Sequence, residues 1–188
     1  MPQPAILCLT FVLLRAAAFV VSGGKPFVDS QSLVVERGGE RVVLKTLTDA
    51  QEFQGFGDLE DGAVFMAYST DTEGGASTML SVYDFARHKE LLICELGATG
   101  ESAFVMSPDG SRIAFNWEDG IYLASTRGLL ASLRKGPVGC ERFRSRFRLV
   151  VKCNTCYEPE WVGPATIRYN GWERDEWRMR EVAVAPEQ

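Results

Sequence analysis

Apolar and polar residues alternate along most of the chain beyond its apolar N-terminal segment. A period of two residues is typical of β-strands, because successive side chains of a strand point to opposite faces. The clearest case is "SLVVERGGERVVL" at residues 32–44, where two β-branched arms flank Gly38 and Gly39. Paired glycines suit the positive φ angles of a tight hairpin turn, so a hairpin is expected here. No strongly periodic helix is expected, although residues 49–54 suggest a helical turn.

Three later segments repeat one layout, in which two strands flank a turn. The paired strands are expected at 63–69 with 78–85, at 112–117 with 121–125, and at 166–169 with 177–184. A shorter strand precedes each pair, and an outer strand can follow the first two pairs. The preceding strands are expected at 52–56, 102–106 and 147–152, and the outer strands at 90–96 and 129–135. The repeat length of about 50 residues is typical of four-stranded propeller blades.

The second of these units contains the most specific motif. "FVMSPDGSRIAF" at residues 104–115 places a four-residue turn between two apolar runs. The turn consists of Ser107, Pro108, Asp109 and Gly110. Proline presets φ for a turn, aspartate can bond to nearby backbone, and glycine tolerates a positive φ. These properties assign the four residues a structural role.

Residues 103–125 resemble the WD40-like repeat of TolB-type β-propellers. The resemblance rests on the Ser-Pro-Asp-Gly turn, on the following Ile113-Ala114-Phe115 strand, and on Ile121-Tyr122. It implies a scaffold that contacts envelope proteins through loops at one end of its blades, and it implies no catalytic residues. The flanking units keep only parts of the motif, Asp61-Gly62 in one and Pro164 in the other.

The three units and the leading hairpin predict an all-β fold of about three to four antiparallel propeller-like blades, incomplete or open. An antiparallel β-sandwich is the alternative, because similar strand patterns occur in that class. A chain of 188 residues is long enough for one buried core and short for two ordinary domains. Residues 24–188 are therefore expected to form a single domain.

Residues 1–23 are expected to be a signal peptide or an N-terminal hydrophobic segment. Ala5 to Leu14 is an apolar run of the length found in signal peptides, and small residues follow it. A periplasmic or secreted location is therefore expected. Arg15 interrupts the segment and no Lys or Arg precedes the run, so a cytoplasmic protein, or one anchored to a membrane by this segment alone, is the alternative.

The formal net charge of −5 conceals one strongly basic stretch. Residues 134–152 contain seven Lys or Arg residues and a single acidic one. Within the stretch, arginines occupy every second position, at Arg142, Arg144, Arg146 and Arg148. A strand would place all four on one face, where they would form a candidate partner-binding surface; the alternative is the solvent face of an amphipathic strand. The acidic overall charge argues against nucleic acid and favours a protein partner.

The cysteines allow several interpretations. Cys8 lies in the N-terminal segment 1–23. The four cysteines that follow it permit up to two disulfides with three possible connectivities. Cys153 and Cys156, in "CNTC", are candidates for a disulfide. A zinc half-site and a redox-active pair are the alternatives at this spacing.

No catalytic residue, metal site or cofactor is assigned. The single histidine, His88, lies among charged residues typical of an exposed turn. Loops at 70–77 and 171–176, together with the arginines, are the expected contact regions. The four tryptophans are expected mostly to pack between sheets. They are Trp117, Trp161, Trp172 and Trp177.

These features favour a non-enzymatic exported module that binds a protein or acts as a scaffold. One alternative is a subunit that completes a propeller by self-association, since open sheet edges need to be covered. The other is a hydrolase or carbohydrate-active enzyme with a cleft that gathers carboxylates. The carboxylates considered are Asp109, Glu118, Asp119 and Glu173.

Overall fold

The computed structural model describes residues 25–59, 61–72, 75–96, 102–117, 119–153, 155–173 and 175–185. The expected signal peptide at residues 1–23 lies outside these ranges. Within them, fourteen β-strands form four antiparallel sheets, and two short α-helices connect two of the strands. The all-β expectation is therefore confirmed. Each sheet is a meander, because strands that are neighbours in the sequence are neighbours in the sheet.

The first sheet is the predicted hairpin with one added strand. Its strands are β1 (Phe27–Asp29), β2 (Ser32–Arg37) and β3 (Glu40–Thr46). Gly38 and Gly39 connect β2 to β3 with φ angles of 59° and 82°. Both angles lie in the region that a Cβ atom disfavours, so the two glycines are required by this turn.

The second sheet contains the first predicted unit in full. Its strands, in sheet order, are β4 (Phe53–Asp58), β5 (Val64–Thr72), β6 (Gly75–Asp84) and β7 (Lys89–Leu96). The predicted loop at 70–77 is shorter than expected, because β5 and β6 stay paired as far as Thr72 and Gly75. His88 lies in the turn between β6 and β7.

The third sheet differs from the prediction in its outer strand. Its strands are β8 (Phe104–Met106), β9 (Arg112–Trp117), β10 (Gly120–Ser125) and β11 (Phe147–Lys152). The segment 147–152 was predicted to begin the third unit, but β11 instead pairs with β10 and closes this sheet. The segment 129–135, predicted as the outer strand, is helical.

The two helices lie between β10 and β11 in the sequence. They are α1 (Leu129–Lys135) and α2 (Cys140–Arg144). In α1, Leu129, Leu130 and Leu133 are buried together, a spacing that brings them to one helical face. Arg134 and Lys135 follow in the last turn, where positive charge stabilises the helix dipole. The run "LLASLRK" therefore satisfies a helix better than a strand.

The fourth sheet has three strands, β12 (Cys156–Gly163), β13 (Thr166–Glu173) and β14 (Glu176–Ala183). The register between β12 and β13 is irregular between Tyr157 and Glu160. In contrast, β13 and β14 pair without a break from Thr166 to Glu173. β14 has no other partner strand among the described residues, so it forms the free edge of this sheet.

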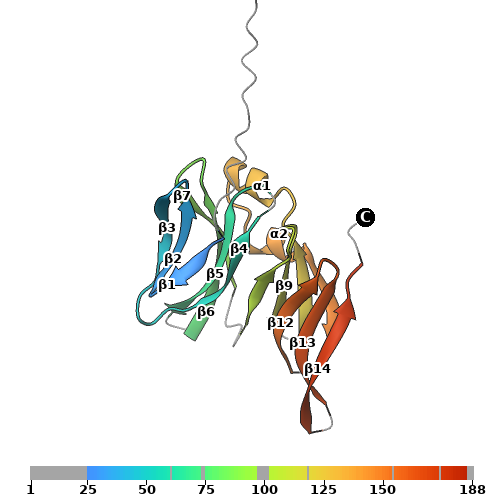
Figure 1. Ribbon diagram of the computed structural model, residues 1–188. Helices are drawn as coiled ribbons and strands as arrows, with labels where there is room; N and C mark the ends of the chain where they lie inside the picture. The colour runs from blue at the N-terminus through green and yellow to red at the C-terminus, as the bar shows by residue number, and fades with distance from the viewer. Residues whose placement is uncertain are drawn as a thin grey trace, which may run out of the picture.

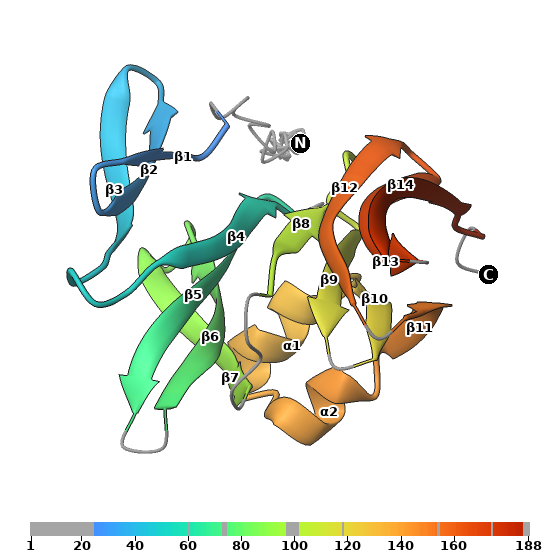
Figure 2. The same ribbon diagram turned by 90° about the horizontal axis from the view of Figure 1, so that it is seen from below.

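The four sheets follow one another in chain order across the molecule, with the helices beside β7 and β11 (Figure 1, Figure 2). A separate core fills each space between consecutive sheets. β5 contributes to two of these cores, since Val64 and Met66 face the first sheet whereas Phe65 and Ala67 face the third. This strand is therefore apolar on both faces.

The first strands of the last three sheets, β4, β8 and β12, lie next to one another (Figure 2). Glycines allow the close approach of β4 to β8. A Cβ atom on Gly55 would overlap the backbone carbonyl of Phe104, and one on Gly57 would overlap the side chain of Met106. Between β8 and β12, the indole Nε1 of Trp161 donates a hydrogen bond of 3.1 Å to the Val105 carbonyl.

Candidate functional site

The Ser-Pro-Asp-Gly segment forms the turn before β9. The Gly110 N–H donates to the Ser107 carbonyl at 2.9 Å, and Gly110 has a φ of 69°. The Asp109 carboxylate accepts hydrogen bonds from the hydroxyls of Ser107 and Ser111 and from the Ser111 N–H. The Ser107 hydroxyl group also accepts a bond of 2.9 Å from the Arg112 N–H. These bonds keep the carboxylate inside the turn.

The same contacts set the ionisation of Asp109. The hydrogen bond from Ser107, followed by those from Ser111 and the positive charge of Arg112, lowers the pKa of this carboxyl from 3.8 to about 2. Partial burial opposes the shift. Asp109 is thus held as a carboxylate that stabilises its own turn.

The four arginines predicted to share one face of a strand do not do so. Residues 140–144 form α2, and β11 begins only at Phe147. Arg142 and Arg144 therefore lie on a helix, Arg146 in the turn after it, and Arg148 on β11. The prediction was wrong because a short helix also buries the apolar side chain of this segment. Phe143, on α2, is 1% exposed.

Two of these arginines have identified structural contacts. The guanidinium of Arg144 lies over the Trp117 ring, 5.1 Å from its centroid. Arg146 donates hydrogen bonds from Nη1 to the carbonyls of Ser125 and Arg127, at 3.2 and 3.0 Å. Arg142 and Arg148 are exposed. The proposed common binding surface is consequently divided among three elements.

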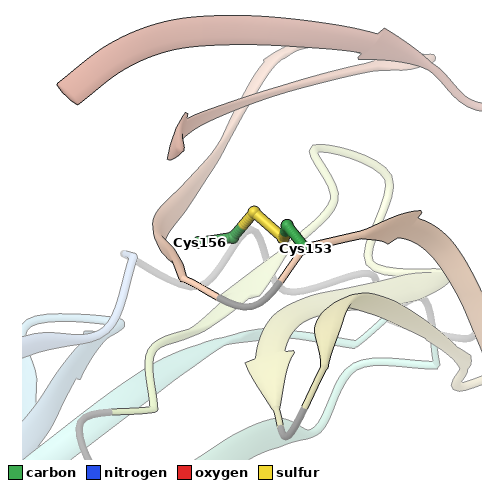
Figure 3. The surroundings of a disulfide bond; sticks show 2 residues. All are labelled: Cys153 and Cys156. Carbon is green, nitrogen blue, oxygen red and sulfur yellow. A yellow bond between two sulfur atoms is a disulfide. The ribbon is translucent and has the colours of Figure 1, made fainter. Parts of the chain in front are cut away.

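Cys153 and Cys156 are joined by a disulfide that links the end of β11 to the start of β12 (Figure 3). Their Cα atoms are 6.0 Å apart, a separation that a disulfide spans. Cys156 is buried in the core between the third and fourth sheets, and Cys153 packs against that core. Among the described residues no group of three His, Cys, Asp or Glu side chains is placed to hold a metal ion.

A hollow of the described surface lies where β4, β8 and β12 meet. It has a volume of about 850 Å³. Its lining residues come from the chain around β4, from the segment before β8, and from the fourth sheet. They are Glu52, Phe53, Gln54, Ser102, Ala103, Tyr157, Glu158, Asn170 and Trp177. This hollow is here called the inter-sheet pocket.

Tyr157 and Trp177 form an aromatic wall of the inter-sheet pocket, and Trp172 packs against Trp177 from outside the lining. The ring centroids of Tyr157 and Trp177 are 5.4 Å apart, and those of Trp177 and Trp172 are 5.1 Å apart. All three side chains are exposed, with Trp177 at 50%. By contrast, Trp117 and Trp161 pack against the cores. The expectation that most tryptophans pack between sheets therefore holds for two of the four.

Polar groups line the pocket beside this wall. The Asn170 amide donates a hydrogen bond of 2.8 Å from Nδ2 to the Glu158 carboxylate. Glu158 has a φ of 51°, unusual for a residue other than glycine, and it lies at the irregular register of β12. Such backbone conformations cost free energy and occur often at binding sites. Glu52 supplies a second carboxylate, and no Lys or Arg lines the pocket among the residues that the structure describes.

Sequence reasoning named the region 171–176 as a contact region but missed the pocket itself. Its residues come from segments more than 120 positions apart, and only the packing of three sheets brings them together. The one sequence signal for the pocket was the pair Trp172 and Trp177, which flank a charged turn. These two residues are directly paired across β13 and β14.

Two of the four carboxylates considered for an enzyme cleft, Asp109 and Asp119, lie far apart. Asp109 lies before β9, and Asp119 lies after it, in the turn to β10. Asp119 accepts a hydrogen bond of 2.7 Å from the Tyr122 hydroxyl. Opposite ends of a six-residue strand are about 20 Å apart, too far for two carboxylates to share a substrate bond. Glu118 and the side chain of Glu173 lie outside the described part of the structure.

The sequence matches no protein-family model, and a search of the curated proteins finds no match. In the described part of the chain, no helix has the length and apolar character needed to cross a membrane.

Proposed function

We propose that this protein is a non-enzymatic module that binds a protein partner through the inter-sheet pocket. The single observation that carries the proposal is the pocket's composition, an exposed aromatic wall beside two carboxylates and two side-chain amides. Exposed aromatic residues are enriched at protein interfaces, where their burial supplies much of the binding free energy. Asn170 and Glu158 offer hydrogen-bonding groups that would orient the partner.

The charge of the pocket favours a partner segment that carries Lys or Arg. Glu52 and Glu158 provide two negative charges, and none of the described residues that line the hollow is basic. A guanidinium or ammonium group placed there would pair with a carboxylate and stack on Tyr157 or Trp177. Aromatic faces and carboxylates together attract cations more strongly than either group alone.

Calorimetric titration of the full chain with short peptides tests this proposal. A Gly-Arg-Gly-Arg-Gly peptide should bind saturably, and the matching Gly-Glu-Gly-Glu-Gly peptide should not. The substitutions Glu158→Gln and Trp177→Leu should each abolish or strongly weaken binding. Glu141→Gln, which removes the same charge from the exposed start of α2, is the matched control and should bind as the unmodified chain does. Equal loss in the control would contradict a role for the pocket.

Binding of neutral oligosaccharides instead of the basic peptide would also overturn the proposal. Such a result would favour the carbohydrate-active alternative. Two variants that carry a photo-crosslinking residue, one at position 177 and one at the distant exposed position 40, then capture the partner in the native compartment. Protein adducts that form at position 177 alone, and that disappear in the Glu158→Gln variant, support a specific partner.

The scaffold that carries the pocket is proposed to be an incomplete β-propeller. Consecutive four-stranded meanders, adjacent first strands and a separate core between neighbouring sheets all support this arrangement. The resemblance of residues 103–125 to TolB-type repeats agrees with it. Export is proposed from the apolar run at residues 5–14, and the disulfide suits an oxidising compartment.

A second candidate function, completion of a ring by self-association, rests on the two end sheets. Along β13, Ile167 packs against the third sheet, whereas Trp172 points to the opposite face, where it is 47% exposed. At the other end of the molecule, Phe27 and Val43 are exposed on the first sheet. Light scattering coupled to size-exclusion chromatography should detect an oligomer that Trp172→Arg dissociates. A strict monomer at all concentrations would reject this candidate.

A further inference from the structure

Two further cysteines, distant in sequence, meet beside the helices. Cys94 lies near the end of β7, and Cys140 is the first residue of α2. We propose that Cys94 and Cys140 form a second disulfide when the protein meets a disulfide oxidant. This modification site is independent of the proposed binding function, because it lies away from the inter-sheet pocket.

Several contacts place the two thiols together. The Cys140 Sγ donates a hydrogen bond of 2.9 Å to the carbonyl of Glu95, the residue that follows Cys94. The Cys140 side chain also lies close enough to the Cys94 thiol to raise its pKa. Cys94 belongs to the core between the second and third sheets, and Cys140 packs against that core. The fold thus brings together two residues that are 46 positions apart in the chain.

The surroundings let an oxidant reach one thiol first. Cys140 is partly exposed, whereas Cys94 is only 5% exposed. Both line a hollow of about 560 Å³ between β7 and the helical segment. Burial, followed by the neighbouring Cys140 side chain, raises the pKa of the Cys94 thiol, so less of this thiol is present as the thiolate that attacks a disulfide. Cys140 is therefore the residue that attacks the oxidant.

The reaction balances with a disulfide of the glutathione class as oxidant. The Cys140 thiolate attacks one sulfur of the oxidant, the oxidant's S–S bond breaks, and one glutathione thiolate leaves. The Cys94 thiol then loses its proton and attacks the Cys140 sulfur of the mixed disulfide. The second glutathione leaves as a thiolate, so two electrons and two protons pass from the cysteines to the oxidant and its medium.

The bond would attach α2 to β7 covalently. α2 has only five residues, too few to be stable without tertiary contacts, and its described anchor is the buried Phe143. Two of the arginines considered for partner binding, Arg142 and Arg144, lie on this helix. Oxidation would thus fix the position of these side chains, while reduction would leave α2 held by packing and by the hydrogen bond from Cys140 to the Glu95 carbonyl.

The test uses the full chain equilibrated with reduced and oxidised glutathione, alkylated, and digested with trypsin without reduction. Cys94 falls in the peptide 90–112 and Cys140 in the peptide 136–142, while Cys153 and Cys156 share the peptide 153–168. Each possible pairing therefore has its own mass. We expect the linked pair of peptides 90–112 and 136–142 to become the main form, with loss of the alkylated form of both.

Cys94→Ser and Cys140→Ser should each abolish the linked peptides, whereas Cys153→Ser with Cys156→Ser should leave them unchanged. In native protein, trypsin should cleave after Arg142 more slowly once the bond has formed. Persistence of both alkylated peptides in oxidised glutathione would overturn the proposal, as would a link from either cysteine to the peptide 153–168. Because the decisive measurement uses the unsubstituted chain, a variant that fails to fold does not affect the conclusion.

Discussion

Arg134 and Asp84 form a two-point ion pair that joins α1 to the end of β6. The Arg134 Nε and Nη2 atoms donate hydrogen bonds of 2.7 and 2.6 Å to the two carboxylate oxygens. The Asp84 side chain is 1% exposed. The hydrogen bonds from Arg134 are the main cause that lowers the pKa of Asp84, and burial opposes them. One residue of the helix thus satisfies a carboxylate buried beside the second sheet.

Replacement of Arg134 by Met should lower the free energy of unfolding by about 1.5 kcal/mol. A hydrogen bond to a charged group contributes about 1.5 to 3 kcal/mol, and the lower value applies because Arg134 is 38% exposed. Urea unfolding followed by tryptophan fluorescence measures the change. Lys135→Met, at the neighbouring exposed position, is the control and should have little effect. Equal destabilisation by both variants would mean that the positive charge at the end of α1, and not the ion pair with Asp84, stabilises the fold.

Asp109 predicts a specific dependence of stability on acid. Its folded pKa of about 2 lies below the ordinary 3.8, so its stabilising effect is complete above about pH 4 and is lost as the pH falls toward 2. Because the side chain is exposed and partly screened, we expect about 1 kcal/mol from this group. Asp109→Asn should be destabilised by that amount at neutral pH, and the difference from the unsubstituted protein should shrink toward zero as the pH falls through about 2. A constant difference across this pH range would contradict the assignment.

Gly55→Ala should be strongly destabilising, by about 1 to 3 kcal/mol, the range for forced overpacking. The added Cβ would overlap the carbonyl oxygen of Phe104, and backbone cannot move aside as a flexible side chain can. Thermal unfolding of the purified variant provides the measurement. Gly163→Ala is the matched control, since no atom lies within 4 Å of its Cβ position. A tolerated Gly55→Ala would show that β4 and β8 separate at little cost.

Phe143→Ala should destabilise the protein by about 3 to 5 kcal/mol, as is usual for a fully buried phenylalanine. The ring is 1% exposed and lies 5.3 Å from that of Phe147. Phe27→Ala, which truncates a phenylalanine that is 41% exposed, is the comparison and should cost much less. Urea unfolding followed by circular dichroism measures the free energy of unfolding of both variants. Similar losses would mean that α2 is not anchored through this side chain.

Strand positions could largely be predicted from the sequence, because alternation and turn residues both act locally. The segments around Gly38 and Gly39 and around Gly110 form the expected turns, since a positive φ is a property of the residue itself. Residues 112–117 and 147–152 are strands at the predicted bounds. The assignment of strand 147–152 to the third unit was wrong. This strand pairs with β10 across a connection that contains two helices, and no local pattern indicates that pairing.

The helices and the pocket could not be predicted for physical reasons. In residues 129–135, apolar side chains suit a buried strand or a helix equally well, and length alone does not separate the two. At residues 142–148, alternation of Arg and Phe continues through a helix end, a turn and a strand start. The inter-sheet pocket depends on long-range packing, which no local pattern encodes.

The exposed edge strand β14 determines how this protein can meet other chains without aggregating. All its residues from Glu176 to Glu181 are exposed, and Glu and Arg recur along it, with an ion pair between Glu176 and Arg178. Charged side chains on an edge oppose the addition of a further strand, because each incoming backbone would have to desolvate them. Contacts at this end of the molecule should therefore form face to face, through the tryptophans, rather than by extension of the hydrogen-bonded sheet.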